Sequence, residues 1–215
     1  MALNSGKIVI VGCGPGAPGY LMDAARQAVA RAGVLAGSRR LLELFPDHPG
    51  LRIVTSTDLD SLLEAVAEQQ AVGRNVAVLV SGDPGLFSLA AKVVRRFGRE
   101  LCEVIPGVSS VQVAFARLGL DWAEARMVSA HGRLPQVAAE ELRQHSKIAI
   151  LAGTAEALRW AAQATAGLQT SHEAYLCENL TLPDERVRPV TAEELAVADA
   201  SSLSIILLIR RELLT

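Results

Sequence analysis

The stretch IVIVGCGPGAPGYL, residues 8–21, joins an unbroken apolar run to a loop of glycine and proline. The run is typical of a buried strand, and the loop leads into a segment of helical period at about 20–32. Three small residues of the loop fit the spacing G-x-G-x-x-G/A of dinucleotide-binding loops: Gly12, Gly14 and Ala17. Pro15 and Pro18 stand in the same loop and have no backbone N–H to donate to a pyrophosphate. The loop alone therefore does not decide its ligand.

Short apolar runs alternate with helical segments through the first half of the chain. Strands are predicted at 7–11, 34–37, 52–55, 75–80 and 102–105. Helices are predicted at 20–32, 38–45, up to about 72, 85–97 and 109–118. Asp58 or Ser61 is expected to cap the third helix, with Glu64 completing a capping box with Ser61. Apolar strands that alternate with helices indicate a parallel sheet covered on both faces.

The pattern changes in the second half of the chain. Strands are predicted at 126–129, 147–152, 173–180, 185–190 and 202–210, with a turn at Pro183-Asp184. Helices are predicted at 135–144 and 154–166, and Thr191 with Glu194 fits a capping box. We therefore predict an α/β protein of two domains. Residues 1–118 form a parallel-sheet domain, and residues 119–215 form a mixed-sheet α/β domain.

The composition is typical of a soluble protein whose core folds without disulfides or metals. The chain has 215 residues, 50% of them hydrophobic, and a formal net charge of −2. No strongly basic run is present, which disfavours nucleic acid as a partner. Its three cysteines are far apart, so they fit neither a disulfide framework nor a metal-binding pair. The apolar runs are too short for a signal peptide or a bilayer span. We expect a cytoplasmic protein with no metal and no membrane partner.

Three turns share one layout of small residues between a strand and a helix. They are GCGPG (12–16), SGDPG (81–85) and PGVSS (106–110). Each one alone is compatible with an ordinary strand-to-helix turn. Together they follow strands of one predicted parallel sheet, and open α/β folds bind ligands at the carboxyl ends of such strands. The three turns therefore predict a shared ligand site.

The expected ligand is not a phosphate group. A nicotinamide-binding domain has an acidic residue about 20 residues after its glycines, for the ribose. The corresponding segment here, RAGVLAGS (31–38), contains none. The loop also lacks the Gly-Lys-Ser/Thr ending of a phosphate loop. A nicotinamide-binding oxidoreductase or a non-catalytic nucleotide-binding module stays as the alternative from another class.

Three segments resemble, in order and spacing, the signatures of the tetrapyrrole methylase family. They are VGCGPGAPGYL (11–21), VSGDPGLFSLA (80–90) and VIPGVSSVQVAFARLGLDW (104–122), and the resemblance runs from about residue 7 to 210. It implies an S-adenosylmethionine-dependent methyltransferase with its cofactor in a cleft between two α/β domains, working as a homodimer. At residue 22 this chain has Met where the family often has Thr, which removes a hydroxyl cap.

Two further segments narrow the resemblance. VSAHGR (128–133) and ENLTLPDER (178–186) resemble the branch of the family that methylates C5 of a precorrin or cobalt-precorrin in cobalamin biosynthesis. Because fused relatives carry a second domain for C15 and decarboxylation, a separate C15-methylating decarboxylase is an expected partner. Another acceptor used in the same superfamily, such as uroporphyrinogen, diphthine or ribosomal RNA, is the alternative.

The resemblance also assigns site residues. It implies contact with the cofactor for Gly12, Gly14, Pro15, Ser81, Gly82, Asp83, Ser109, Ser110, Ala152, Asn179 and Leu180. For the substrate, whose rim carries carboxylates, it implies His131, Arg133 and Glu178, since arginine pairs with carboxylates through two hydrogen bonds. The sequence identifies no general base, and the enamine-like ring carbon does not require a strong one.

Overall fold

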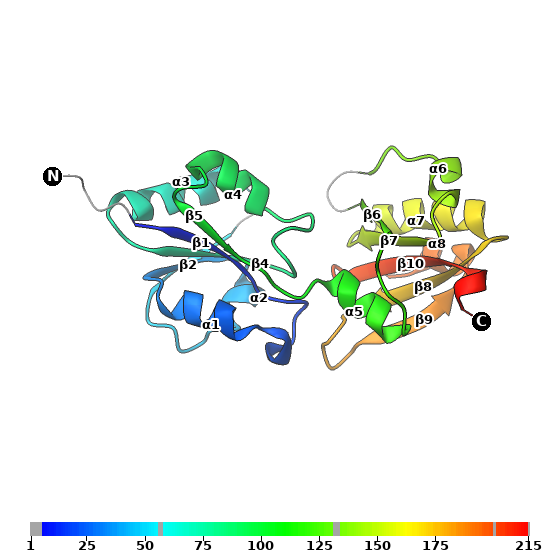
Figure 1. The fold of residues 1–215 in the computed structure, drawn as a ribbon, viewed down its shortest axis with the longest axis horizontal. Helices are drawn as coiled ribbons and strands as arrows, with labels where there is room; N and C mark the ends of the chain where they lie inside the picture. Colours follow the sequence, from blue (N-terminus) through cyan, green and yellow to red (C-terminus); the bar gives the residue numbers. More distant parts are fainter. Residues whose placement is uncertain (1–5, 56–57, 131–133, 200, 215) are drawn as a thin grey trace. The chain divides into compact units, whose positions relative to one another are not determined.

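The computed structural model describes residues 6–55, 58–130, 134–199 and 201–214. The chain forms two compact units, Met1–Ser109 and Ser110–Thr215, each with its own sheet (Figure 1). The division falls before helix α5 (Ser110–Arg117), whereas the sequence placed it after this helix, at 118/119. Helix α5 groups with the second unit because it contacts strand β10 (Ser204–Arg210) of that unit.

The first unit contains the predicted five-stranded parallel sheet. Its strands are β1 (Ile8–Gly12), β2 (Val34–Gly37), β3 (Leu51–Val54), β4 (Val76–Val80) and β5 (Cys102–Ile105). They lie in the order β3-β2-β4-β1-β5, and every pair is parallel. Strand β1 therefore lies between β4 and β5, so the three strands that precede the glycine-containing turns are immediate neighbours.

Helices cover both faces of this sheet (Figure 1). They are α1 (Asp23–Ala30), α2 (Arg39–Leu42), α3 (Leu59–Ala71) and α4 (Ala90–Phe97). Val9 and Val11 of β1 belong to the core beneath α1 and α2, whereas Ile8 and Ile10 belong to the core beneath α3 and α4. Successive side chains of a strand point to opposite faces, so an unbroken apolar strand is needed to fill both cores.

Two helices of the first unit begin several residues later than the sequence predicted. Helix α1 begins at Asp23 because a 3₁₀ turn, Pro18–Tyr20, occupies the preceding residues. Helix α4 begins at Ala90, and the residues before it form a turn in which Phe87 has a φ of 46°. A left-handed backbone is uncommon for a bulky residue, and such strain is often found at functional segments.

Helix α3 begins as predicted but not with the predicted capping box. Asp58 is its N-cap, and its carboxylate accepts a hydrogen bond from the Asp60 N–H at 3.1 Å. The capping box expected for Ser61 and Glu64 is wrong. Ser61 lies within the first helical turn, where its hydroxyl donates to the Asp58 carboxylate. Asp58 therefore takes the capping position, and the Ser61 hydroxyl supports its carboxylate.

The second unit contains the predicted mixed sheet. Its strands are β6 (Arg126–Ser129), β7 (Lys147–Ala152), β8 (His172–Glu178), β9 (Arg186–Val190) and β10, in the order β6-β7-β10-β8-β9. Strands β6 and β7 are parallel, and the other pairs are antiparallel. The predicted pairing of the two segments around Pro183-Asp184 is confirmed by the β8–β9 ladder.

Besides α5, the described part of this unit has three α-helices: α6 (Ala139–Arg143), α7 (Ala155–Leu168) and α8 (Ala192–Val197). Helix α6 is shorter than the predicted 135–144. Helix α8 begins with the predicted capping box, in which the Thr191 hydroxyl accepts from the Glu194 N–H at 3.2 Å. None of the helices in the described part of the chain is both long and apolar enough to cross a bilayer.

The three cysteines are free thiols. Cys13 and Cys177 are buried, and Cys102 is partly exposed. Burial raises the pKa of Cys13 and of Cys177 to about 12. Both buried thiols therefore stay protonated at neutral pH and pack as small apolar side chains rather than acting as nucleophiles.

Candidate functional site

The three glycine-containing turns meet at one edge of the parallel sheet, as the sequence predicted. They follow β1, β4 and β5, which are adjacent and parallel, so their carboxyl ends lie side by side. This carboxyl edge is where open α/β sheets bind their ligands. We call the three turns, residues 12–16, 81–85 and 106–110, the glycine rim.

The first two turns of the glycine rim are joined through their backbones. The Gly82 N–H donates to the Gly14 carbonyl at 2.8 Å, and the Gly14 N–H donates to the Gly82 carbonyl at 3.3 Å. Both residues have positive φ angles, 74° for Gly14 and 65° for Gly82, which glycine adopts at low cost. The Cys13 N–H is also used, by the Val80 carbonyl at 2.9 Å. These N–H groups are already hydrogen-bonded within the protein, so the loop does not offer them to a pyrophosphate.

Gly12 and Gly107 let the first and third turns pack against each other. A Cβ atom on Gly12 would lie 2.6 Å from the Gly107 nitrogen. A Cβ atom on Gly107 would lie 2.3 Å from the Gly82 carbonyl oxygen and 2.8 Å from the Gly12 carbonyl oxygen. Backbone atoms cannot move aside as a flexible side chain can. These two glycines are therefore required by close approach of one backbone to another.

Asp83 links the second turn to the third. One of its carboxylate oxygens accepts from the Gly85 N–H at 2.7 Å, and the other accepts from the Gly107 N–H at 3.1 Å. Hydrogen bonds to an ionised carboxylate are stronger than neutral ones. Asp83 thus holds the glycine rim together, in addition to any contact with a ligand.

Burial differs among the other predicted cofactor residues of this unit. Pro15 is buried together with Gly12 and Gly14, and Ser109 is only 6% exposed. Ser81 is exposed, and its hydroxyl accepts a hydrogen bond from Arg40 at 3.2 Å. Ser81 is therefore the most accessible polar side chain of the predicted set in this unit.

A cavity of about 190 Å³ lies beside Ser81 at the same carboxyl edge. It is lined by the hydroxyl residues Ser38, Thr55, Ser81 and Ser88 and by the apolar residues Leu41, Leu79, Val80, Phe87 and Leu89. We call it the rim cavity. A larger cavity of about 510 Å³ lies at the opposite edge, next to Lys7 and Asn75 where β1 and β4 begin. We place the candidate site at the rim cavity, because α/β sheets bind ligands at the carboxyl ends of their strands.

In the second unit, Ala152 ends strand β7 and is buried. Leu180 is also buried, whereas Glu178 and Asn179 are partly exposed. Asn179 has a φ of 50°, and its side chain is held at both ends. Its amide nitrogen donates to Asp184 at 2.6 Å, and its amide oxygen accepts from the Ser201 hydroxyl at 2.8 Å. These bonds shape the loop between β8 and β9.

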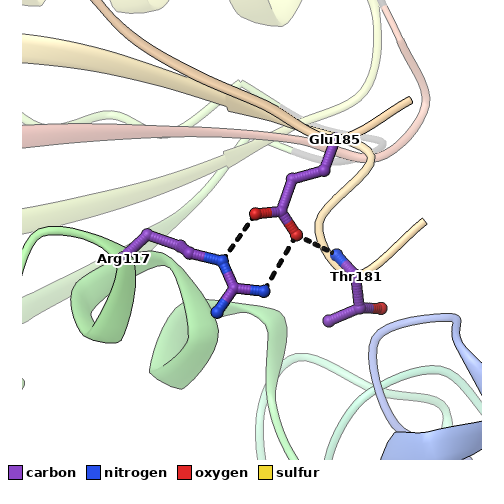
Figure 2. Close-up of polar contacts among 3 residues, drawn as sticks. All are labelled: Arg117, Thr181 and Glu185. Carbon is purple, nitrogen blue, oxygen red and sulfur yellow. Dashed lines mark hydrogen bonds and ion pairs between the residues drawn. The ribbon is translucent and has the colours of Figure 1, made fainter. Parts of the chain in front are cut away.

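Glu185 fixes the other side of the same loop, as Figure 2 shows. Its carboxylate accepts from Arg117 of α5 at 2.5 Å and 3.0 Å, and from the Thr181 N–H at 2.5 Å. These hydrogen bonds, Arg117 first, hold the pKa of Glu185 below its ordinary value. Thr181 has a φ of 72°, a strained value for a β-branched residue. The ion pair and the Thr181 bond thus oppose the tendency of the strained loop to relax.

The predicted substrate residues His131 and Arg133 lie outside the described residues.

Sequence reasoning missed Arg40 and Arg117. Arg40 is the second arginine of AGSRRLLEL, and the signal was its place just after β2, at the carboxyl edge. Arg117 lies within a quoted signature segment, but its partner Glu185 is 68 residues away, so no local pattern pairs them.

The fold and the glycine rim place the chain in a class of proteins: α/β proteins that bind a ligand at the carboxyl edge of a parallel sheet. The sequence model of the Tetrapyrrole (Corrin/Porphyrin) Methylases matches residues 7–196, and the chain belongs to this family. The family is one of methyltransferases that use S-adenosylmethionine, so the nicotinamide-binding alternative is not supported.

Particular relatives are similar over most of the chain. The cobalt-precorrin-7 C(5)-methyltransferase of Salmonella typhimurium is 33% identical over 188 residues, which are 86% of this chain and 92% of that protein. The decarboxylating precorrin-6Y C(5,15)-methyltransferase of Mycobacterium tuberculosis is 31% identical over 86% of this chain but only 46% of its own length.

Solved structures share the fold. The precorrin-6Y methylase of Archaeoglobus fulgidus is 32% identical, with a TM-score of 0.74 over 95% of this chain and 98% of that one. The uroporphyrin-III C-methyltransferase of Thermus thermophilus, solved with S-adenosylhomocysteine, has a TM-score of 0.75 over 95% of this chain and 92% of that one. It is 22% identical, so this likeness concerns the fold alone.

Proposed function

We propose that this protein transfers a methyl group from S-adenosylmethionine to C5 of cobalt-precorrin-7, or of the corresponding metal-free precorrin, in cobalamin biosynthesis. The observation that carries the proposal is the 33% identity with a C5-methyltransferase over 92% of that relative's length. The structural neighbour at 32% identity, a precorrin-6Y methylase, supports a precorrin as the acceptor.

The glycine rim fits this cofactor better than it fits a dinucleotide. The Cys13 and Gly14 amides are already bonded within the protein, and Pro15 has none, so a pyrophosphate would find few donors. A sulfonium is a cation and is tolerated beside carbonyl and carboxylate oxygens. When bound, S-adenosylmethionine supplies an electrophilic methyl group on a positively charged sulfur.

The chain's own residues then have to hold the donor and the acceptor in line and exclude water. Such alignment is worth on the order of 7–11 kcal/mol of the barrier. We propose that these residues contact the cofactor: Gly12, Gly14, Pro15, Ser81, Gly82, Asp83, Ser109, Ser110, Ala152, Asn179 and Leu180. The buried and mutually bonded glycines act through the shape of the rim, and Ser81 acts through its exposed hydroxyl.

For the substrate we propose contacts to His131, Arg133 and Glu178. Arg133 would pair with a carboxylate of the macrocycle, and His131 would contact the ring or carry a proton. Replacing Arg133 by Ala should then weaken macrocycle binding and leave S-adenosylhomocysteine binding unchanged.

We also propose a cytoplasmic homodimer. In this proposal, methylation at C15 and decarboxylation, which the name of the M. tuberculosis relative includes, belong to a separate protein. The support is that the Salmonella typhimurium relative, of which the match covers 92%, is named for C5 methylation alone. Co-purification of such a decarboxylase with the tagged chain, and the mass of the chain in solution, test these two points.

The decisive experiment is transfer of a labelled methyl group. The protein is incubated with methyl-labelled S-adenosylmethionine and cobalt-precorrin-7, and separately with uroporphyrinogen III as the competing acceptor. We expect one labelled methyl on the precorrin by mass spectrometry, assigned to C5 by NMR, and none on uroporphyrinogen. Methylation of uroporphyrinogen in preference to the precorrin would overturn the proposed acceptor while keeping the family.

A further inference from the structure

Arg40 is a cation built into the carboxyl edge of the first unit. It lies on α2, between Ser38 and Leu41, and both of these line the rim cavity. Its guanidinium donates to the hydroxyl of Ser81, which lines the same cavity and belongs to the glycine rim. The adjacent Arg39 is exposed, whereas Arg40 is half-buried. The chain thus directs one of two neighbouring arginines toward the candidate site.

Nothing described in the structure neutralises this cation. Among the described residues, the ion pairs of arginine involve Arg117, Arg126, Arg210 and Arg211, and Arg40 has no carboxylate within 4.0 Å. Its hydrogen bond to Ser81 uses one of the five N–H donors of the guanidinium. Burial lowers the pKa of Arg40, but an arginine side chain stays charged at neutral pH. The remaining donors of the Arg40 guanidinium are therefore available to a ligand.

The rim cavity itself lacks a hydrogen bond that a polar ligand would supply. The Thr55 hydroxyl oxygen is buried and has no hydrogen-bond partner among the described residues. Thr55 follows β3 and lines the rim cavity together with Ser38, Ser81 and Ser88. Four hydroxyl residues among the apolar lining, with the Arg40 guanidinium bonded to one of them, suit an anionic group at the end of an apolar ligand.

We propose that Arg40 binds a carboxylate of the ligand at the rim cavity, most directly an acetate or propionate group of the macrocycle. The proposal rests on the proposed function for the identity of the macrocycle, but the carboxylate site stands on the structure alone. Arginine matches a carboxylate with two parallel hydrogen bonds, and Ser81 orients its guanidinium. The amino-acid carboxylate of S-adenosylmethionine is a second source of the same chemistry, which the experiment separates.

The test compares Arg40→Gln with Arg39→Ala, its exposed neighbour on the same helix. Glutamine keeps N–H donors but carries no charge. A second variant, Arg40→Lys, restores the charge without the planar guanidinium that can form two parallel hydrogen bonds. Two probes are titrated: uroporphyrin III, a polycarboxylate tetrapyrrole, by fluorescence, and S-adenosylhomocysteine by calorimetry. Thermal unfolding of each variant shows that the fold is kept.

We expect Arg40→Gln to weaken uroporphyrin binding about tenfold or more, Arg40→Lys to recover part of it, and Arg39→Ala to stay within about twofold of wild type. A loss confined to S-adenosylhomocysteine would support the carboxylate site and assign it to the cofactor. Unchanged binding of both probes in a folded Arg40→Gln variant, or no binding of either probe by the wild type, would overturn the proposal. If the wild type methylates no precorrin while Arg40→Gln still loses uroporphyrin, the proposed function fails and the carboxylate site stands.

Discussion

At the scale of single residues, the glycines of the rim have two different roles. Gly14 and Gly82 are needed because their φ angles are positive. Gly12 and Gly107 have no such backbone angle, and are needed because three backbones converge where a Cβ atom would have to fit. The sequence pattern G-C-G cannot tell these two roles apart, although they predict different responses to alanine.

Gly107→Ala is expected to destabilise the protein by about 1–3 kcal/mol, as overpacking does. The added methyl would lie 2.3 Å from the Gly82 carbonyl oxygen, so the third turn must move away from the second. Binding of S-adenosylhomocysteine should weaken at the same time. Gly19→Ala is the matched control, since no atom lies within 4 Å of a Cβ placed there. Equal stability of the two variants in urea unfolding would contradict the packing role.

Met22→Thr is expected to stabilise the protein by about 0.5–1 kcal/mol, because it would supply the missing cap of α1. Met22 is the N-cap, has the extended backbone of such a residue, and makes no side-chain capping bond. It is 39% exposed, so its removal sacrifices little packing. Met22→Ala serves as the control without a hydroxyl. A threonine variant no more stable than the alanine variant in thermal unfolding would show that the cap does not form.

At the scale of elements, the loop between β8 and β9 depends on a helix far away in sequence. Asn179 and Thr181 hold left-handed backbones, and Glu185 of the same loop pairs with Arg117 of α5. Strained residues persist where the surrounding contacts over-determine them. The predicted cofactor residues Asn179 and Leu180 thus sit on a segment held by that network of bonds.

Glu185→Gln is expected to cost about 1 kcal/mol or less at pH 7, since both partners are partly exposed, and to speed hydrogen exchange of the Thr181 amide. In the folded protein the pKa of Glu185 is lowered, chiefly by its hydrogen bonds to Arg117. The stabilisation that the ionised Glu185 contributes is therefore complete above the unfolded pKa of about 4.3 and is lost as pH falls through the folded pKa. The difference between wild type and variant in urea unfolding should therefore shrink below about pH 4.

Glu141→Gln is the control, because its ion pair with Arg126 is more exposed, at 49% for Glu141 and 41% for Arg126, and Glu141 makes no bond to Thr181. We expect it to change stability less and to leave the exchange of the Thr181 amide unaltered. A Thr181 amide that exchanges equally fast in the wild type and the Glu185 variant would argue against the bracing role.

At the scale of the whole molecule, the two units have separate cores on either side of residue 109. Ile206 and Leu208 of β10 join the core beneath α7, while their neighbours Ile205 and Leu207 are buried on the other face. Helix α5 contacts β10, so it belongs to the covering of this second sheet.

We expect the fragment 110–215 to be better folded than the fragment 119–215. Removing 110–118 deletes α5, leaving Arg117's partner unpaired and part of β10 uncovered, and exposed apolar sheet surface promotes aggregation. Size-exclusion chromatography and circular dichroism of both fragments give the comparison. If both fragments are equally compact and equally folded, the result would support the boundary at 118/119 that the sequence predicted.

The sequence by itself determined the strands, their parallel or mixed arrangement and the three turns, because apolar periodicity and glycine-proline punctuation are local signals. The signature segments also carried the family, which the match over 7–196 shows. Only the tertiary structure decided which groups the turns leave for a ligand. Several contacts join residues that are distant in sequence. They are the two backbone hydrogen bonds between Gly14 and Gly82, the two bonds of Asp83, the Arg117–Glu185 ion pair and the bond from Arg40 to Ser81. Such contacts depend on strand order and packing, which no local pattern contains.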